Sequence, residues 1–432
     1  MKELIRNFLQ QTEEKDSNLF PFLANKKTFD SAKDTVYYSG PFWDHEEITE
    51  SIHSMMKGKW LSSGEKVARF EKHFGEQFNL AHNLMVNSGS SANLVMIAAL
   101  KKYFGWSDDD EIIVCVCGFP TSIAPIVQNR LTPVFVDISW HDLNWDLSQV
   151  EAKITSRTRA VLSSPVLGNP YDYDKIVDIC NKYGIQLIAD NCDSLGSKWN
   201  AQYLTDRAVA ASCSFYPAHH LCTMEGGMVS SNNPEIVALA RSFSWWGRDC
   251  HCVGAQNLIG CGMCGERFKN WLPNYAGVVD HKYVFTNMGY NLKPLDLQGG
   301  IGLVQLKKWE QIHSLRRSNK LTIQKHLETV AGVRVVNELP QAETSWFGVP
   351  VVCETKEQKQ KLVTHLEKSR IQTRNYFAGN ILMHAGYQHL DDANKYPNSS
   401  QVLDRVFFLG CSPTISKEMI DYIGSVVGQF TA

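Results

Sequence analysis

The chain has 432 residues, enough for two or three domains of about 150 residues each. Its hydrophobic fraction of 44% and charged fraction of 20% are typical of a folded protein and exclude a disordered or low-complexity chain. The net charge of −2 gives no basic field that would favour nucleic acid or an anionic membrane. No run approaches the ~18 consecutive apolar residues of a membrane helix, and the first residues lack a signal peptide's apolar stretch. We therefore expect a cytoplasmic globular protein that binds neither nucleic acid nor membrane.

Between residues 82 and 230, short runs rich in β-branched residues alternate with helical patterns. The expected strands are 111–117, 133–138, 160–164 and 185–190, and the expected helices are 91–104, 122–130 and 173–183. The strands read as almost continuous apolar runs, as they do when both faces of a sheet are buried. The alternation therefore predicts a mostly parallel sheet covered by helices on both faces.

Residues 245–290 do not continue this alternation of strands and helices, because they are rich in Gly, Trp, Cys and Tyr and show no clear hydrophobic period. A long helical pattern follows at 294–329. The rest of the chain has an expected strand at 346–353 and expected helices at 356–368 and 417–430. We therefore expect three parts, namely an N-terminal arm, a large α/β domain that carries the 245–290 insertion, and a small α+β domain, at residues 1–40, 41–315 and 316–432.

Three motifs in the α/β region carry groups that could bind a cofactor. In N-S-G-S-S-A-N (87–93), Gly89 and Ser90 open a helix whose N-terminus could bind a phosphate, although such a turn can simply cap the helix. Asp190 ends a buried strand, where open α/β sheets bind ligands, so its carboxylate could face a cationic ring nitrogen or cap a helix. The third motif, S-C-S-F-Y-P-A-H-H (212–220), precedes M-E-G-G and contains Ser214 and His219.

Together these motifs resemble fold-type I pyridoxal-phosphate enzymes, and most closely the sugar aminotransferases and dehydratases that act on nucleotide-linked keto sugars. In those aminotransferases, a lysine five residues after the serine forms a Schiff base with the cofactor. That position is His219 here, and no lysine occurs from residue 199 to 268. A histidine cannot form this imine but is suited to general acid–base catalysis. The resemblance implies that the cofactor, pyridoxal phosphate in the aminotransferases, is used here as pyridoxamine phosphate, with His219 as the base. Alternatively, His219 has only a packing role, and the chain is an inactive homologue that binds a sugar nucleotide.

The resemblance also implies roles for other residues. Phe119 would stack on the pyridine ring, unless it is an ordinary core residue. Asp190 would pair with the ring nitrogen, and Asn291 would reach across a homodimer to the phosphate of the neighbouring cofactor. Arg374 and the segment 377–380 would meet the sugar nucleotide. The implied cofactor-binding set is Gly89, Ser90, Phe119, Asp190, Asp193, Ser214 and Asn291.

The chain contains twelve cysteines. In a cytosolic protein, clustered cysteines indicate metal or redox chemistry more often than disulfides. Seven cysteines are scattered among apolar neighbours and are expected to be small buried hydrophobic residues, namely Cys115, Cys117, Cys180, Cys213, Cys222, Cys353 and Cys411. The other five are Cys192, which follows Asp190, and Cys250, Cys252, Cys261 and Cys264, which fall within fifteen residues.

This second set resembles the iron–sulfur branch of the family, the CDP-4-keto-6-deoxyglucose 3-dehydrase group. That branch has a Cys after the strand-end Asp, a Cys-x-Cys pair 58 residues later, and a Cys before an Arg-Phe. Cys192, Cys250, Cys252 and Cys264 match this order, and four thiolates suit a [2Fe–2S] cluster. The family's spacing would place the last ligand at Gly260, so Cys261 is the alternative to Cys264. A structural zinc site is the alternative to the cluster.

The resemblance thus implies a 3-dehydratase of a nucleotide-linked 4-keto-6-deoxyhexose, with CDP-4-dehydro-6-deoxyglucose as the expected substrate. It would act in 3,6-dideoxysugar biosynthesis, as for lipopolysaccharide, and an electron-donating reductase with flavin and iron–sulfur centres would be its partner. One rival is a cluster-free 3-dehydratase driven by an amino donor such as glutamate. The others are a nucleotide-sugar aminotransferase and the inactive homologue.

Overall fold

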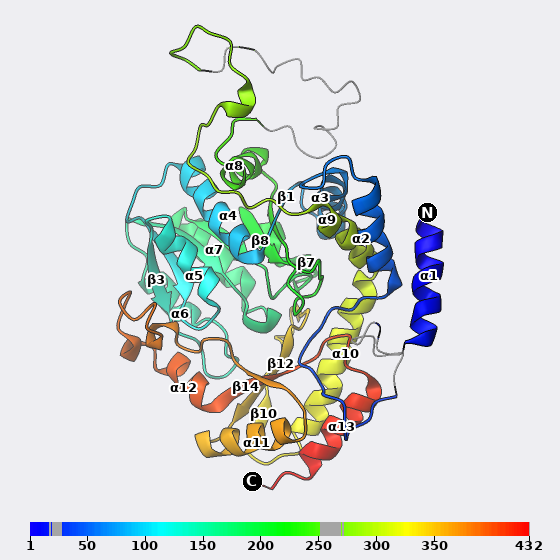
Figure 1. The fold of residues 1–432 in the computed structure, drawn as a ribbon. Helices are drawn as coiled ribbons and strands as arrows, with labels where there is room; N and C mark the ends of the chain where they lie inside the picture. Colours follow the sequence, from blue (N-terminus) through cyan, green and yellow to red (C-terminus); the bar gives the residue numbers. More distant parts are fainter. Residues whose placement is uncertain (17–18, 20–27, 251–268, 270–271, 432) are drawn as a thin grey trace.

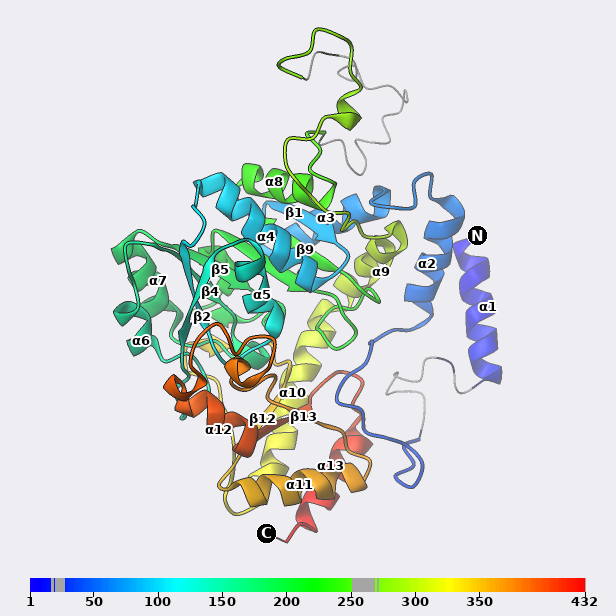
Figure 2. The same cartoon turned by 60° about the vertical axis from the view of Figure 1, so that its left-hand side comes forward.

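The computed structural model describes all residues except 17–18, 20–27, 251–268, 270–271 and 432 (Figures 1 and 2). Its centre is a seven-stranded sheet in the order β1-β9-β8-β5-β4-β2-β3. Strand β9 is antiparallel to both of its neighbours, and every other neighbouring pair is parallel. The strands are β1 (His82–Val86), β2 (Glu111–Cys115), β3 (Thr132–Val136), β4 (Thr158–Ser163), β5 (Gln186–Asp190), β8 (Ala210–Ser214) and β9 (Gly227–Ser231).

Helices cover both faces of this sheet, because alternate side chains of each strand point to opposite faces. In β2, Ile112 and Val114 pack in one core with α4, α5 and α8, whereas Ile113 and Cys115 pack in another core with α6 and α7. The helices around the sheet are α2 (His45–Lys57), α3 (Glu65–Phe78), α4 (Gly89–Phe104), α5 (Pro120–Gln128), α6 (Leu147–Ala152), α7 (Tyr173–Tyr183) and α8 (Pro234–Ser244). The mostly parallel sheet between two helical layers is therefore confirmed, and so are the four expected strands and three expected helices.

The long helix expected at 294–329 is wrong in one respect, because it is two helices, α9 (Asp296–Lys307) and α10 (Trp309–Leu327). The chain turns at Lys308, which lets α9 pack against α2 and α3 while α10 runs to the second sheet. Close packing of α9 requires glycine, since a Cβ at Gly299 would lie 2.4 Å from the backbone nitrogen of Val67.

A second, antiparallel sheet has the order β10-β12-β14-β13 and packs against α10, α11 and α13. The boundary expected between residues 315 and 316 falls inside α10. The elements are β10 (Val333–Val335), β12 (Gly348–Cys353), α11 (Lys356–Lys368), β13 (Thr373–Asn375), α12 (Pro397–Arg405), β14 (Val406–Gly410) and α13 (Lys417–Gly428). A small third sheet joins β6 (Lys198–Trp199), β7 (Gln202–Tyr203) and β11 (Ala342–Glu343).

The N-terminal segment begins with α1 (Lys2–Lys15), which lies along α2 in both views (Figures 1 and 2). The arm then reaches the second sheet, where Val36 bridges to Ile371. Short 3-10 turns are η1 (Val166–Gly168), η2 (Leu204–Arg207), η4 (His281–Tyr283), η5 (Ile381–Met383) and η6 (Ala393–Lys395). In the part of the chain that the structure describes, no helix is long and apolar enough to cross a membrane.

Candidate active site

A cavity of about 580 Å³ lies at the carboxyl ends of β2, β4, β5 and β8. This is the edge at which open α/β sheets bind ligands. The other wall comes from the arm and from the second sheet with its loops, so residues far apart in sequence meet here. The large sheet and its helices contribute Gly89, Ser90, Phe119, Ser122, Ser164, Asp190, Cys192, Asp193, Ser214, Tyr216 and His219, and the opposite wall contributes Tyr38, Phe347, Arg374, Phe377, His384 and Phe408.

One end of the cavity is the N-terminus of α4. Ser88 caps this helix, since its hydroxyl accepts a hydrogen bond from the backbone N–H of Ser91 at 3.1 Å. The next residues, Gly89 and Ser90, line the cavity. A Cβ at Gly89 would lie 2.4 Å from the Cβ of Ser214, so only glycine allows the two segments to approach this closely. The turn therefore caps the helix and also exposes its N-terminus and hydroxyl groups, a combination that fits a phosphate.

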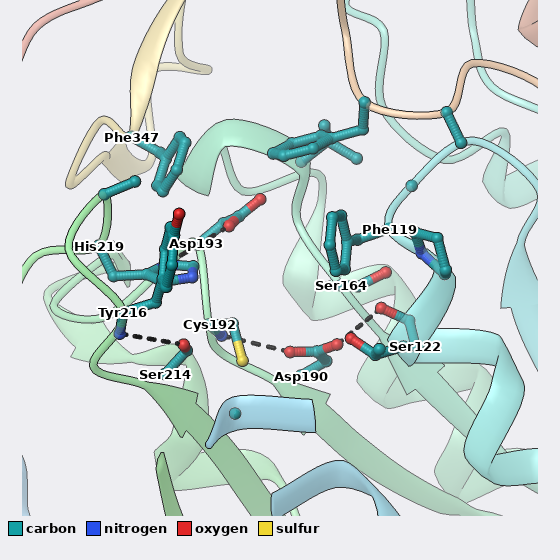
Figure 3. A pocket seen from close by; sticks show the side chains of 18 of the residues that line it. Phe119, Ser122, Ser164, Asp190, Cys192, Asp193, Ser214, Tyr216, His219 and Phe347 are labelled. Carbon is teal, nitrogen blue, oxygen red and sulfur yellow. Dashed lines mark hydrogen bonds and ion pairs between the residues drawn. The ribbon is translucent and has the colours of Figure 1, made fainter. Parts of the chain in front are cut away.

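Asp190 lies at the floor of the cavity, at the end of β5 (Figure 3). Its carboxylate accepts hydrogen bonds from Asn93 at 2.8 Å and Ser122 at 2.6 Å, and from Ser212 at 3.3 Å. It also accepts a bond from the backbone N–H of Cys192 at 3.3 Å. A capping residue would not need three side-chain donors. A fixed carboxylate that is only 7% exposed suits a cationic ring nitrogen.

We expect Asp190→Ala to weaken cofactor binding by about 10- to 100-fold, because a hydrogen bond to a charged group contributes ~1.5–3 kcal/mol. The measurement is an absorbance titration of the chain with pyridoxamine phosphate. Asp190→Asn is the matched control for shape, since it keeps an acceptor for Ser122 and Asn93 but loses the charge, and it should weaken binding as well. Wild-type affinity for pyridoxamine phosphate in both variants would mean that Asp190 has only a structural role.

His219 and Asp193 enter the cavity from the side opposite Phe119 (Figure 3). Burial, and then the positive charge of Arg316, lowers the pKa of His219 to about 4. Burial, and then the negative charge of Asp190, raises the pKa of Asp193 to about 8. The surroundings thus disfavour the charged form of both side chains, and their closest atoms, His219 Nδ1 and Asp193 Oδ1, are 3.8 Å apart. A neutral imidazole is the form that can accept a proton.

Only the first histidine of the His219–His220 pair faces the cavity. His220 is 3% exposed, and its Nε2 lies 2.9 Å from the backbone oxygen of Ser345, away from the lining residues. Among the described residues that line the cavity there is no lysine. The described part of this site therefore offers a base but no amine for a Schiff base.

Phe119 is 52% exposed and its ring lies 6.0 Å from that of Phe377, so it is not an ordinary core residue. Its stacking on a pyridine ring stays a prediction. Arg374 also lines the cavity, with its guanidinium 4.2 Å from the centre of the Tyr38 ring. Asn291 does not line it; its side-chain oxygen accepts a bond from Lys293 at 2.6 Å on the surface, so its role towards a second subunit also stays a prediction.

The predicted metal ligands lie in different settings. Cys192 lines the cavity, and Cys250 follows α8 with its sulfur 3.1 Å from Nε2 of the buried His281. Cys252, Cys261 and Cys264 lie outside the described residues. Within the described ranges, no group of three or more His, Cys, Asp or Glu residues could hold a metal ion, and the ligand set stays a prediction. The seven scattered cysteines are buried, as expected.

Sequence reasoning missed several residues of this site. Asn93 and Ser122 hold Asp190, yet their only signal was a position near a helix N-terminus. Tyr216 lay inside a predicted motif but received no role. Tyr38 comes from the arm and Phe347 directly precedes β12, and no local pattern connects them to Asp190.

Comparison with known proteins decides the family, since a model of the DegT/DnrJ/EryC1/StrS aminotransferase family matches residues 43–428. The chain belongs to this family. Among its DegT/DnrJ/EryC1/StrS relatives, a dTDP-4-dehydro-2,6-dideoxy-D-glucose 3-dehydratase of Saccharopolyspora spinosa is 34% identical over 94% of this chain and 88% of the relative. The lipopolysaccharide biosynthesis protein RfbH of Salmonella typhimurium is 33% identical over 94% and 93%.

The chain is also similar to a solved structure, that of the E. coli GDP-4-keto-6-deoxy-D-mannose-3-dehydratase with bound hydrated pyridoxal phosphate. It is 30% identical, has a TM-score of 0.78, and covers 91% of this chain and 100% of that chain. The fold is therefore that of fold-type I pyridoxal-phosphate enzymes, as the sequence motifs predicted. The relatives include sugar 3-dehydratases and also an enzyme named GDP-perosamine synthase, which is 25% identical.

Proposed function

We propose that this protein is a 3-dehydratase of a nucleotide-linked 4-keto-6-deoxyhexose. The observation that carries the proposal is that the cavity wall has His219, an imidazole whose pKa is lowered by burial, at the position where the family's aminotransferases have their lysine. The names of the S. spinosa and E. coli relatives support the same reaction class. An inactive homologue is disfavoured, because Asp190 and the N-terminus of α4 line the same cavity as this histidine.

The residues present fit pyridoxamine phosphate. Gly89, Ser90 and Ser214 would hold its phosphate, Asp190 its ring nitrogen and Phe119 one face of its ring. When bound, the cofactor supplies an amine for the sugar's C4 ketone and a ring that accepts electrons. His219 would accept the proton from the carbon that carries this amine, and the sugar's C3 hydroxyl would then leave.

We further propose that Cys192, Cys250, Cys252 and Cys264 hold a [2Fe–2S] cluster, with Cys261 as the alternative fourth ligand. The soft thiolate set suits iron–sulfur chemistry, and Cys192 is placed in the wall of the cavity two residues after Asp190. When present, the cluster would supply single electrons from a flavin and iron–sulfur reductase. Iron and sulfide analysis separates this cluster from zinc.

A second candidate is a cluster-free 3-dehydratase that uses glutamate. It is favoured by a solved relative, 29% identical, whose GDP-4-keto-6-deoxymannose-3-dehydratase structure contains a trapped adduct of pyridoxal phosphate and glutamate. The cysteine order favours the cluster instead. In both cases the protein would act as a homodimer in which Asn291 meets the neighbouring cofactor phosphate.

The substrate proposed is CDP-4-dehydro-6-deoxyglucose, since the cysteine order resembles the branch that acts on CDP sugars. The test compares kcat/KM for CDP-, dTDP- and GDP-linked 4-keto-6-deoxyhexoses, with loss of the C3 hydroxyl as the readout. We expect the CDP sugar to give the highest value. A higher kcat/KM for a dTDP or GDP sugar would show that the proposed CDP substrate is wrong. If none of the three sugars loses its C3 hydroxyl, the proposed dehydratase reaction is wrong.

A further inference from the structure

A buried arginine lies directly behind the cavity. Arg316 of α10 is 1% exposed; its positive charge favours the charged form of the Asp193 carboxyl, and its side chain also contacts that of Cys411. Its guanidinium donates to backbone carbonyl oxygens on two different segments. One nitrogen donates to Ala218 at 3.2 Å and His219 at 3.0 Å, and the other to Trp346 and Phe347, both at 3.2 Å.

A charge buried in this way is costly, because carbonyl dipoles replace only part of the lost hydration. The planar fork of arginine is the one side chain that can hold two such pairs of acceptors in fixed directions. The two segments belong to different sheets, since residues 218–219 follow β8 of the large sheet and residues 346–347 precede β12 of the second sheet. Arg316 therefore joins the two walls of the cavity at one point.

The imidazole of His219 depends on this junction. Its Nδ1 has no hydrogen-bond partner among the described residues, and the nearest carboxylate oxygen, on Asp193, is 3.8 Å away. The ring contacts the backbone of Cys192 and packs against the rings of Phe347 and Tyr216, with 5.1 Å and 6.5 Å between the ring centres. The guanidinium thus holds both the backbone that carries the imidazole and the backbone that carries the ring beside it.

We infer that Arg316 is a positioning residue for proton transfer, which fixes His219 and Phe347 relative to each other across the two sheets. This inference rests on the proposed role of His219 as the base. Misplacing a reacting group by ~1 Å can cost ~10²-fold in rate. Substitution of Arg316 should therefore lower kcat rather than substrate binding.

The test uses the full chain loaded with pyridoxamine phosphate. Arg316→Lys keeps the charge but cannot hold both pairs of carbonyls, and Arg316→Gln keeps a donor without the charge. Arg317→Lys is the matched control, because Arg317 lies on the same helix but bonds Glu338 and the backbone of Thr344. For each variant we would measure kcat per bound cofactor, KM, the melting temperature, and the exchange of the cofactor's methylene proton with D₂O.

For Arg316→Lys we expect kcat and the exchange rate to fall by about 10²-fold, with KM and cofactor content close to wild type, while Arg317→Lys stays near wild type. If Arg316→Gln does not fold, Arg316→Lys alone carries the test. The inference is overturned if Arg316→Lys lowers only the melting temperature, or lowers cofactor content while kcat per bound cofactor is unchanged.

The decisive step repeats Arg316→Lys in a His219→Asn background. A residue that acts through His219 should cause no further loss of exchange there, because effects on one catalytic unit are not additive. An equal loss in both backgrounds would overturn the inference and leave the proposed base intact. An active His219→Asn variant would instead contradict the proposed base itself, so the two failures are distinguishable.

Discussion

His219→Asn is expected to keep its cofactor and lose turnover by about 10²- to 10⁴-fold, the usual contribution of a general base. Asparagine is close to histidine in size and can fill the space beside Phe347, but its amide cannot accept the proton. The measurement is kcat per bound cofactor, together with exchange of the cofactor's methylene proton into D₂O.

His220→Asn is the matched control for this prediction. His220 is the neighbouring histidine but is 3% exposed, and its Nε2 lies 2.9 Å from the backbone oxygen of Ser345 instead of lining the cavity. We expect its substitution to lower the melting temperature, with a much smaller effect on kcat per bound cofactor. Near-normal turnover of His219→Asn together with a large loss in His220→Asn would transfer the role of base to His220.

The second large effect is loss of the cluster. Serine in place of Cys192, Cys250, Cys252 or Cys264 should abolish iron and sulfide binding after anaerobic reconstitution, because a hydroxyl group is a poor replacement for a soft thiolate ligand. Cys261→Ser should keep both. Cys264 directly precedes G-E-R-F, as the last Cys of the resembling branch precedes an Arg-Phe, and lengthening a loop costs only ~0.6 kcal/mol per doubling of its length.

Cys250→Ser is the cleanest variant for activity, since Cys250 does not line the cavity. It should stop the reduction that follows departure of the C3 hydroxyl, while His219 still supports that departure. Cys180→Ser, on α7 and buried, is the control for the loss of a thiol as such. Cluster loss in Cys261→Ser with retention in Cys264→Ser would exchange the two ligands. Bound zinc in place of iron would mean that these cysteines form a structural site and transfer no electrons.

The central strands were predictable because burial on both faces leaves an apolar run in the sequence. Strand β8 was not, since A-A-S-C-S contains no β-branched residue and owes its conformation to its neighbours β5 and β9. The turn at Lys308 between α9 and α10 was missed for a similar reason. Nothing in the local pattern marks it, and only the packing of each helix against a different layer requires it.

In the candidate site, Asp190 and His219 could be found because each lies in a local motif next to a strand end. The residues that hold them could not. Ser122 and Asp190, for example, are 68 positions apart in the chain, yet their side chains form a hydrogen bond. The same separation hides Arg316 and Phe347, whose positions relative to His219 follow from how the two sheets pack.

The central claim is that a histidine in the lysine position makes this protein remove the C3 hydroxyl instead of transferring an amino group to C4. The most direct measurement is carbon-13 NMR of the product formed from labelled CDP-4-dehydro-6-deoxyglucose with pyridoxamine phosphate, with glutamate or a reducing system added in parallel samples. We predict a product that lacks the C3 hydroxyl and depends on the reducing system. A 4-amino sugar with C3 still hydroxylated would contradict the claim.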